Sequence, residues 1–385
     1  MEIRNLPWYG LGAIYEQDDI DAVVNILKPC ITESKGFFRL PEEPQFQKVF
    51  AEYEECRYAS AVNSCGTGLD LALQVLDIDS GDEVITTPLT FVCTATCILL
   101  RGAKVVFADI DPRTYNLDPA SVERKITKNT KAVIPVHFGG LPADIEGFER
   151  LSKKYSVKIV YDAAHAAGSC YKGKKLGGFG DMTVFSFQSN KNMSTLGEGG
   201  AVTTDNQEYF DRLERLKSFG FKYGPVDDVV EPGTNLRMTK LQSAVGLTQL
   251  KKLDRNNEFR EKYTKYLSEK LKDIKEITIP YEPQGYKSAC HLYTLLFNDE
   301  KMGKSTEEFI GILKGKYKIG ISRHYKAVYE WAVFKEKGYT GADTPVAAKV
   351  TRQLLNIPVF PNMKEDDFNY IVWAIKETIC ELRGK

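Results

Sequence analysis

Short apolar segments alternate with helical segments over the first half of the chain, and this rhythm constrains the fold more than any other feature. Strand-like runs at residues 59–63, 83–86, 104–109, 132–137 and 157–162 are each followed by a turn or a helical stretch. Strands separated by helices pair in parallel, because each crossover returns the chain to the same edge of the sheet. The sequence therefore predicts an α/β fold with a mostly parallel central sheet flanked by helices, and a site at the carboxyl ends of its strands.

The composition changes about two thirds of the way along, which predicts a second, smaller domain. A helix at 239–250 is followed by a long charged helix at 254–271, and the later segments mix helices with strands such as 319–325. We therefore expect a large α/β domain at residues 1–250 and a small α+β domain at residues 251–385. The N-terminal segment of the large domain is a candidate to pack on the small one.

Charge and hydropathy exclude several classes of partner. The 385 residues include 52 basic and 52 acidic side chains, so the formal net charge is zero. This balance gives no electrostatic reason to expect binding to a nucleic acid or an anionic membrane. No apolar run is long enough to span a bilayer, and the first residues lack the basic-then-apolar order of a signal peptide. We therefore expect a cytoplasmic protein.

The eight cysteines predict neither a disulfide framework nor a metal site. No export signal accompanies them, and Cys93 and Cys97 share a helical spacing inside an apolar segment, without a CxxC pair or a nearby histidine. These two are expected to be small core residues, and no metal is expected.

The strand at 59–63 runs into Ser64-Cys65-Gly66-Thr67-Gly68 and then directly into a helix. Free backbone N–H groups at a helix N-terminus bind anions, and glycines let a phosphate come close. The segment therefore predicts a phosphate site, although a plain tight turn would use the same residues. No Walker lysine and no GxGxxG fingerprint are present, which argues against a P-loop and against a nicotinamide site.

An aspartate closes the apolar strand at 157–162, where folds of this class place ligand contacts. If Asp162 is buried, its carboxylate needs a cationic or hydrogen-bond-donating partner. It could also be a helix N-cap, because alanines follow it. His165, one of four histidines, could contact the same ligand or be a structural core histidine.

Residues 181–200 combine an apolar, β-like entry, a run of small polar residues with one lysine, and a glycine-rich exit. Lys191 lies in the polar run, between Asn190 and Asn192, on a predicted sharp turn. Desolvation at the end of a sheet would lower the pKa of its ammonium, and a neutral amine is the form that makes an imine. A solvated loop lysine is the alternative, since most lysines are solvated.

Together these three features predict a cofactor that carries a phosphate, a basic ring nitrogen and an aldehyde. Pyridoxal 5′-phosphate (PLP) has all three groups. Asp162 would keep the pyridine nitrogen protonated, and Lys191 would hold the aldehyde. Phe91, which follows a turn at Pro88, could lie flat on the ring or be an ordinary core phenylalanine.

The chain resembles the DegT/DnrJ/EryC1/StrS family of sugar aminotransferases from about residue 60 to 250. The matching segments are CGTGLDLAL, TPLTFVCTATCILLRGAKVVFADID, PVHFGGLPADI, VYDAAHAAGSCYKGKKLGGFGDMTVFSFQSNKNMSTLGEGGAVTTD and GTNLRMTKLQSAVGLTQL. They occur in the order and spacing of the family. The resemblance implies a fold-type-I PLP transferase, similar to aspartate aminotransferase.

The resemblance also implies a role for each matching residue. Lys191 matches the Schiff-base lysine of the family. Asp162 and His165 match the positions that contact the pyridine nitrogen and the ring 3-hydroxyl, and Ser186 matches a phosphate ligand. The remaining matches are the phosphate cradle Gly66, Thr67 and Gly68; Asn235, which in the family reaches the phosphate across a homodimer interface; and the substrate-side pair His324 and Tyr325.

Two departures from the family pattern fall in the cradle. Cys65 stands where the family has a serine, and Gly68-Leu69-Asp70 stands where Ala-Ala-Leu is usual. Since the cradle uses mainly backbone N–H groups, we expect phosphate binding to persist.

The expected activity is transfer of an amino group from L-glutamate or L-glutamine to a keto-sugar, with a nucleotide-linked keto-deoxysugar as acceptor. A keto-cyclitol or a keto-sugar phosphate is an alternative acceptor. A PLP-dependent sugar dehydratase is a further alternative, although the intact Lys191 favours transamination. A regulatory or binding protein on the same fold is the non-enzyme alternative.

Overall fold

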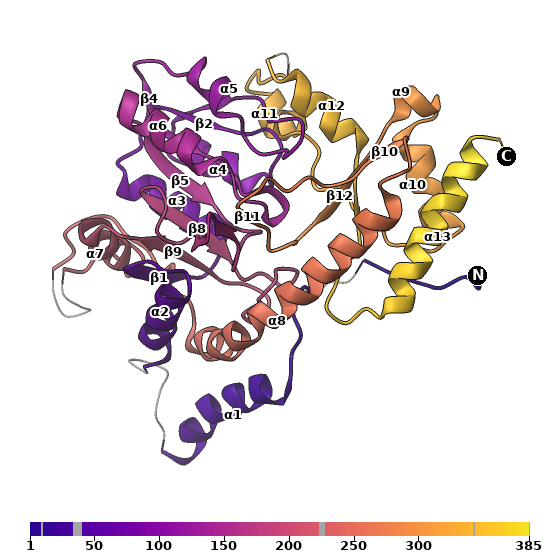
Figure 1. The fold of residues 1–385 in the computed structure, drawn as a ribbon. Helices are drawn as coiled ribbons and strands as arrows, with labels where there is room; N and C mark the ends of the chain where they lie inside the picture. Colours follow the sequence, from indigo (N-terminus) through magenta and orange to yellow (C-terminus); the bar gives the residue numbers. More distant parts are fainter. Residues whose placement is uncertain (9–10, 34–40, 223–227, 342, 385) are drawn as a thin grey trace.

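The computed structural model describes residues 1–8, 11–33, 41–222, 228–341 and 343–384. Its centre is a seven-stranded sheet in the order β1-β9-β8-β5-β4-β2-β3 (Figure 1). The strands are β1 (Tyr58–Val62), β2 (Glu83–Thr86), β3 (Lys104–Phe107), β4 (Thr130–Ile134), β5 (Lys158–Asp162), β8 (Met182–Ser186) and β9 (Gly200–Thr204). Neighbours from β3 to β8 pair in parallel, whereas β9 is antiparallel to both β8 and β1. The predicted mostly parallel sheet is confirmed.

Helices cover both faces of this sheet. One layer contains α2 (Glu42–Tyr53), α6 (Ile145–Tyr155) and the start of α8, and the other contains α3 (Cys65–Val75), α4 (Cys93–Leu100) and α7 (Gln207–Leu216).

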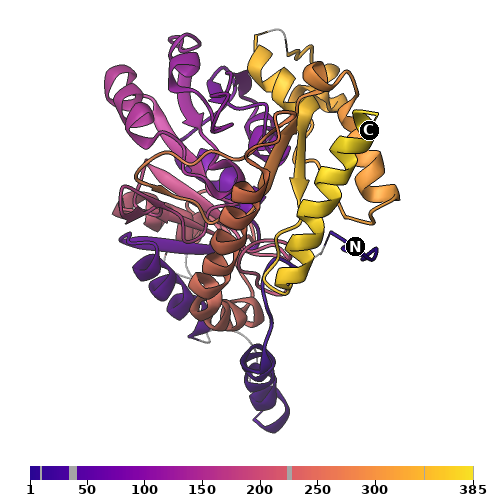
Figure 2. The same cartoon turned by 45° about the vertical axis from the view of Figure 1, so that its right-hand side comes forward.

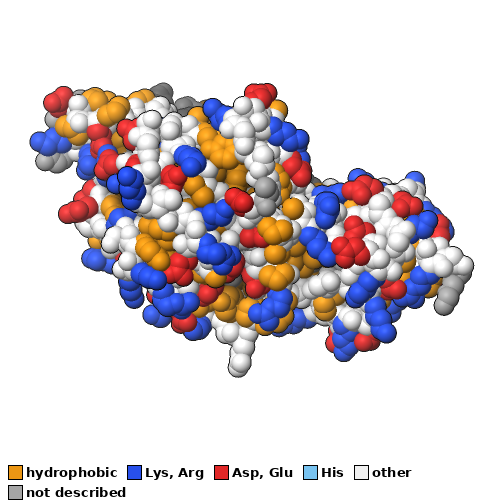
Figure 3. Space-filling model, turned by 90° about the horizontal axis from the view of Figure 1, so that it is seen from above, with side chains coloured by type: hydrophobic (Ala, Val, Ile, Leu, Met, Phe, Trp, Pro, Cys, Tyr) orange, Lys and Arg blue, Asp and Glu red, His pale blue; other side chains and the backbone are white. Residues whose placement is uncertain are grey.

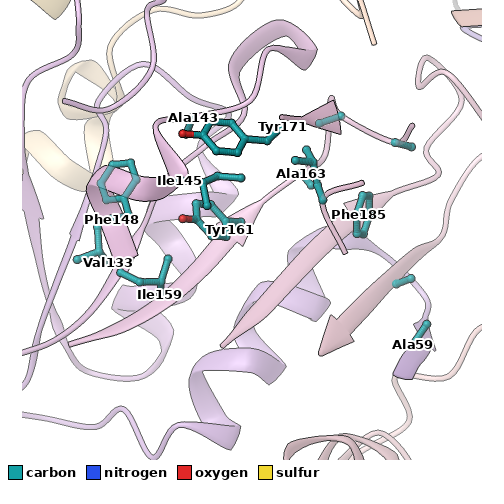
Figure 4. Close-up of a cluster of buried hydrophobic side chains, with 14 of the residues drawn as sticks. Ala59, Val133, Ala143, Ile145, Phe148, Ile159, Tyr161, Ala163, Tyr171 and Phe185 are labelled. Carbon is teal, nitrogen blue, oxygen red and sulfur yellow. The ribbon is translucent and has the colours of Figure 1, made fainter. Parts of the chain in front are cut away.

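Successive residues of β5 show how the strands serve the two layers. Ile159 and Tyr161 pack near Phe148 of α6 (Figure 4), whereas Val160 faces the other layer. Side chains alternate between the faces of a strand, and here both faces are buried, so the strand reads as a continuous apolar run.

A single helix, α8 (Lys240–Leu271), runs unbroken for 32 residues and lies between the sheet and the C-terminal part (Figures 1 and 2). The sequence predicted two helices here, and this was wrong. Lys252 lies on a buried face of α8, where its Nζ pairs with Asp18 and Asp19 of α1 (Gln17–Thr32), and Leu253 is fully buried. The change from apolar to charged residues therefore marks a change of surroundings along one helix. The predicted domain boundary near residue 250 falls inside α8.

The C-terminal part has its own sheet and its own hydrophobic cluster. Strands β10 (Ile277–Thr278), β12 (Tyr293–Phe297) and β13 (Leu354–Ile357) are antiparallel, and α10 (Thr306–Gly315) and α13 (Glu365–Leu382) pack in the same cluster. Leu6 belongs to this cluster as well, and its N–H donates to the carbonyl of Lys318. The other elements are α5 (Pro119–Glu123), β6 (Cys170–Tyr171), β7 (Lys174–Lys175), β11 (Tyr286–Lys287), α9 (Asp299–Met302), α11 (Ala332–Lys335) and α12 (Pro345–Gln353).

The strand predicted at residues 319–325 is not present as such. The segment pairs only at isolated positions, Ile319 with Leu6 and Ser322 with Asn356. Beyond Ser322 the backbone N–H of His324 is taken by the side-chain oxygen of Asn356, so the ladder of main-chain bonds stops there. No helix in the described ranges is long and apolar enough to cross a bilayer.

Candidate active site

A cavity of about 410 Å³ opens at the carboxyl ends of the central strands. Because β9 is antiparallel to both its neighbours, β1 runs in the same direction as β8, so the helix that follows β1 starts at this edge too. The lining side chains and backbone come from Ser64, Cys65, Gly66, Thr90, Phe91, Cys93, Val136, Asp162, Ala164, His165, Ser186, Gln188, Asn190, Lys191, Glu198, His324 and Tyr325. A second cavity of the same volume, between α8 and residues 279–294, contains none of the predicted site residues. The chemistry of the lining, not its size, identifies the site.

Lys191 lies on a tight turn after β8, and the backbone holds this turn firmly. Its N–H donates to the carbonyl of Gln188, and the N–H of Gly12 donates to the carbonyl of Ser189. A Cβ on Gly12 would lie 1.9 Å from the carbonyl oxygen of Asn190, so the N-terminal segment rests directly on the turn. The carbonyl of Gly12 in turn accepts a bond from the buried Arg260, which also donates to the carbonyl of Val359.

The Lys191 amine has no hydrogen bond or ion pair to any described residue. Burial lowers its pKa from the usual value, and the nearby Cys65, Asp162 and Cys93 only partly oppose this effect. A larger share of the amine is therefore neutral and nucleophilic than for a lysine in water.

Asp162 is 3% exposed and accepts two hydrogen bonds. Its Oδ2 lies 2.7 Å from the donating hydroxyl of Thr94, and its Oδ1 accepts from the N–H of Ala164 at 3.0 Å. Burial raises the pKa of the carboxyl, against the effect of both donors, and no cationic side chain pairs with it in the described parts of the chain. A turn, not a helix, follows Asp162, so it does not act as an N-cap.

His165 and Tyr325 form a hydrogen-bonded pair with a defined direction. The Nδ1 of His165 accepts from the N–H of Gly139 at 3.3 Å, so its Nε2 carries the hydrogen and donates to the Tyr325 hydroxyl at 3.0 Å. The hydrogen of that hydroxyl is then free to point at a ligand. Burial lowers the pKa of His165 and raises the pKa of Tyr325, so both stay neutral near pH 7.

The N-terminus of α3 supplies free donors to the cavity. Ser64 caps the helix, since its Oγ accepts from the N–H of Thr67, and its carbonyl accepts from the N–H of Gly68. The first two helical N–H groups, those of Cys65 and Gly66, have no partner within the helix. At Gly66 an added Cβ would meet nothing closer than 3.6 Å, so a ligand can approach the backbone there.

Comparisons with known proteins agree with this geometry. The sequence matches the DegT/DnrJ/EryC1/StrS aminotransferase family over residues 16–376. The chain belongs to that family. It is 37% identical over 358 residues to the spore coat polysaccharide biosynthesis protein SpsC of Bacillus subtilis (strain 168), covering 90% of this chain and 92% of SpsC.

Solved structures of similar proteins extend over almost the whole chain. Helicobacter pylori PseC, an aminotransferase involved in the biosynthesis of pseudoaminic acid, superposes with a TM-score of 0.89 and 28% identity, covering 97% of this chain and all of PseC. The PLP form of Spr1654 from Streptococcus pneumoniae gives a TM-score of 0.89 and 25% identity, covering 98% of this chain and all of Spr1654. This member of the DegT/DnrJ/EryC1/StrS family is therefore a PLP-dependent aminotransferase of fold type I, in a family of sugar aminotransferases.

The cavity fits the cofactor of the family on three independent observations. Asp162 is a buried carboxylate that lacks a cation, as the protonated ring nitrogen of PLP would provide. Two N–H groups at the start of α3, beside Ser186 at the end of β8, suit a phosphate. The unpaired amine of Lys191 suits an aldehyde.

Most site residues predicted from the sequence lie in this cavity, but not all of them do. Gly66, Phe91, Asp162, His165, Ser186, Lys191, His324 and Tyr325 line it. Phe91 is 53% exposed at the cavity wall, with its ring tilted by 58° to that of Tyr325, so it is not a core residue.

Three predicted residues lie outside the cavity of the single chain. The hydroxyl of Thr67 donates to Asn63, and Gly68 faces the sheet with its N–H already used. Asn235 is exposed, and its side-chain oxygen accepts from Arg237. Its predicted role across a homodimer interface stays a prediction.

Thr94 was not singled out from the sequence, although it donates the shorter of the two bonds to Asp162. It lies one residue into an apolar helix, and nothing in its local sequence distinguishes it from a core threonine. Ser64, which caps α3, was identified only as part of the turn.

Proposed function

We propose that this enzyme transfers an amino group from L-glutamate or L-glutamine to a keto-sugar, with a nucleotide-linked keto-deoxysugar as acceptor. The observation that carries the proposal is the unpaired, desolvated amine of Lys191 facing a cavity that also holds the buried carboxylate of Asp162. The names of SpsC, a polysaccharide biosynthesis protein, and PseC, an aminotransferase of pseudoaminic acid biosynthesis, support a sugar as acceptor.

When bound, PLP supplies an electron sink that stabilises negative charge on the carbon beside an amine. The residues of this chain bind it and move the protons. The N–H groups of Cys65 and Gly66 and the hydroxyl of Ser186 would hold the phosphate, and Asp162 would pair with the ring nitrogen. Thr94 and the N–H of Ala164 would keep that carboxylate ionised and oriented.

Lys191 would serve as the amine that anchors the cofactor and, once released, as the base of the reaction. Because burial lowers its pKa, a larger share of the released Nζ is neutral than for a lysine in water, and a neutral Nζ can accept a proton from the donor substrate. The Tyr325 hydroxyl, which accepts from His165, keeps its own hydrogen for an oxygen atom of the cofactor or the substrate. His324 lines the same wall and is held by its backbone N–H to Asn356, which suits a contact with the acceptor sugar.

A second copy of the chain is part of the proposal. Asn235 is exposed and lies outside the cavity in the single chain, as expected for a residue that serves the site of a partner subunit. Apolar side chains are also exposed on α1, including Ile20 and Ile31, which are 56% and 84% exposed. We further propose a cytoplasmic location, since all eight cysteines carry free thiols, as in a reducing compartment.

The test is an absorbance spectrum of the PLP-loaded protein before and after addition of L-glutamate or L-glutamine, beside Lys191→Ala. We expect the visible band to bleach in the wild type with one of these donors and to persist in the variant. A panel of nucleotide-linked keto-sugars should then restore the band and yield the amino-sugar, with parallel double-reciprocal plots. Bleaching without restoration by any sugar would reject the acceptor, and no bleaching with any amino acid would reject the donor half-reaction.

A further inference from the structure

His291 lies where three parts of the chain meet behind the cavity wall. Its ring stacks on that of His165, with the centroids 4.5 Å apart and the planes at 29°. Its Nδ1 lies 2.9 Å from the side-chain oxygen of Asn192, which directly follows Lys191 in the chain. One side chain thus contacts both the His165 ring and the residue beside the lysine.

The hydrogen bonds around Asn192 fix the direction of this contact. The Nδ2 of Asn192 donates to Oδ1 of Asn257 and to the carbonyl of Ala289, both at 2.8 Å. Asn257 has its own Nδ2 committed to the carbonyl of Ala167, so its Oδ1 is an acceptor. Both amide hydrogens of Asn192 are therefore used, its Oδ1 must accept, and Nδ1 of His291 must carry the hydrogen.

The network ties three elements together. Asn257 belongs to α8, Asn192 belongs to the lysine turn, and His165 follows β5. Asn192 and Asn257 are 3% and 7% exposed, so these bonds have little competition from water. Burial lowers the pKa of both His165 and His291, and two stacked imidazolium rings would repel each other, so the pair is neutral.

We infer that His291 is a positioning residue: through Asn192 it fixes the turn that carries Lys191, and through its ring it fixes the plane of His165. The side chain of Lys191 has to move between anchoring the cofactor and accepting a proton, while its backbone stays in place. The hydrogen bond from His291 to Asn192, the residue next to Lys191, holds the backbone of the turn in place while the lysine side chain moves. The inference rests on the proposed transamination, because the catalytic cost is expected in that reaction.

Two variants separate the contacts of His291. His291→Phe keeps a ring that can stack on His165 but removes the donor to Asn192, whereas Asn192→Ala removes the same bond together with those to Asn257 and Ala289. We expect each to lower kcat of the donor half-reaction by about tenfold or more, with KM for the donor changed less than about threefold, because misplaced reacting groups slow chemistry more than binding. The double variant should be little worse than Asn192→Ala alone, since Asn192→Ala already removes the bond to His291.

His137→Phe is the matched control. His137 is also a buried histidine stacked on an aromatic ring, that of Tyr161 at 4.9 Å and 15°, and its Nδ1 accepts from the N–H of Ala143, so neither of these contacts involves a side chain of this network. Its loss is expected to lower the melting temperature and to leave kcat within about twofold of wild type. Equal losses of kcat in His137→Phe and His291→Phe would overturn the inference, because both would then reflect general destabilisation.

A readout without substrate or cofactor comes from ¹⁵N histidine NMR of the unloaded protein. In wild type, Nδ1 of His291 and Nε2 of His165 should both show as protonated nitrogens of fixed tautomers. Asn192→Ala should let the His291 tautomer exchange and should shift the His165 signals, and His137→Phe should change neither. If Asn192→Ala leaves both the His165 signals and kcat unchanged, the inference is overturned. If the wild type proves inactive with every donor, the proposed function fails, and the NMR comparison still decides whether Asn192 and His291 orient His165.

Discussion

Lys191, Asp162 and His165 are ionisable groups that burial pushes toward their neutral forms. The pKa of the lysine and of the histidine is lowered, and the pKa of the aspartic acid is raised. Neither Lys191 nor Asp162 has an ion-pair partner among the described residues, and their mutual attraction only partly offsets the effect of burial. A ligand that brings a ring cation and an aldehyde supplies what both groups lack, which makes binding of PLP and ionisation of Asp162 mutually supportive.

The hydrogen bond from Thr94 helps to lower the pKa of Asp162 against the effect of burial, and removing its hydroxyl tests this role. Thr94→Val keeps the shape of the side chain but takes away the donor at 2.7 Å, so the pKa of Asp162 should rise further. Since a hydrogen bond to a charged group contributes about 1.5–3 kcal/mol, we expect the donor half-reaction at pH 7 to slow by about tenfold and its acid limb to move to higher pH. Stopped-flow bleaching of the cofactor band across pH measures both effects.

Thr94→Ser provides the control for this prediction, because it keeps the hydroxyl and loses only a methyl group. Its pH profile should overlay that of the wild type. Equal behaviour of the serine and valine variants would mean that the hydroxyl does not act on Asp162.

Glu54 predicts a pH dependence of stability that is independent of catalysis. It is fully buried, accepts from the N–H of Gly168, and leaves its second oxygen without a partner among the described residues. Burial raises its pKa to about 7 from 4.5. The folded state therefore binds this proton more tightly than the unfolded state, so the contribution of Glu54 to the free energy of unfolding falls as pH rises from 4.5 to about 7.

Glu54→Gln removes that titration while preserving the shape of the side chain. At pH 8 we expect the variant to be more stable than wild type by about 1–3 kcal/mol, whereas at pH 4.5 the two should be nearly equal. Urea unfolding at both pH values measures the difference. If the free energies of unfolding of variant and wild type differ by the same amount at both pH values, Glu54 does not titrate with the raised pKa.

Residues with a strong local signal were predictable, and residues defined by distant partners were not. Asp162 ends an apolar strand and Lys191 interrupts a β-like run, so both stand out in the sequence. Thr94 lies 68 positions from Asp162, and His291 lies 99 positions from Asn192. Only the folding of the sheet brings these pairs together, and each residue looks ordinary beside its sequence neighbours.

At the scale of elements, α3 has one end at the cavity and one face on the sheet. Its first turn offers N–H groups, while Gly68, one turn further, lies against three valines of the sheet. A Cβ there would be 2.8 Å from Val184, 3.1 Å from Val202 and 3.3 Å from Val62. This close packing accounts for glycine where the family pattern has alanine, and it fixes the height of the helix start above the strand ends.

Gly68→Ala should destabilise the protein although alanine favours helices. The overpacking cost of about 1–3 kcal/mol exceeds the gain in helix propensity of about 1 kcal/mol, because the contacts are with buried β-branched side chains. Gly311→Ala in α10 is the matched control, since nothing lies within 4 Å of its added Cβ. We expect Gly68→Ala to lower the melting temperature and Gly311→Ala to raise it or leave it unchanged. A stabilised Gly68→Ala would contradict the packing.

The elements also show where local patterns mislead. The sequence predicted most strands of the central sheet to within a few residues, because a doubly covered strand is a short apolar run between turns. It predicted a break in α8 and a strand at residues 319–325, and it missed α12 and β13. The composition along α8 changes because the helix leaves the sheet and packs in another hydrophobic cluster. From the sequence alone, this change of surroundings cannot be told from a break between two helices.

At the scale of the whole molecule, charged side chains and exposed apolar side chains are distributed differently over the surface. On the face seen in Figure 3, basic and acidic side chains are interspersed, without a field of one sign. Helix α1 projects from the body in Figures 1 and 2, with apolar side chains such as Ile20 and Ile31 exposed. A second subunit covering α1 would bury them and could bring Asn235 to the cavity of its neighbour.

A mixture of two inactive variants tests whether sites are shared between subunits. Lys191→Ala and Asn235→Asp should each have little activity, the second because its carboxylate would repel a phosphate. If Asn235 serves the partner subunit, a heterodimer of the two contains one intact site, and a statistical 1:1 mixture should recover about a quarter of wild-type activity. Activity is measured after unfolding and refolding the mixture together. If Asn235 acts within its own chain, the mixture stays inactive.

The N-terminal segment on the lysine turn has a consequence for how the enzyme is made. Gly12 precedes its contacts in the chain, which are with the lysine turn and with Arg260, whose other bond reaches Val359. The clamp on the turn is therefore complete only after Val359 has left the ribosome. Nascent chains that contain the whole central sheet but not Val359 should capture cofactor poorly, so loading with PLP becomes a late event that follows synthesis of the segment around Val359.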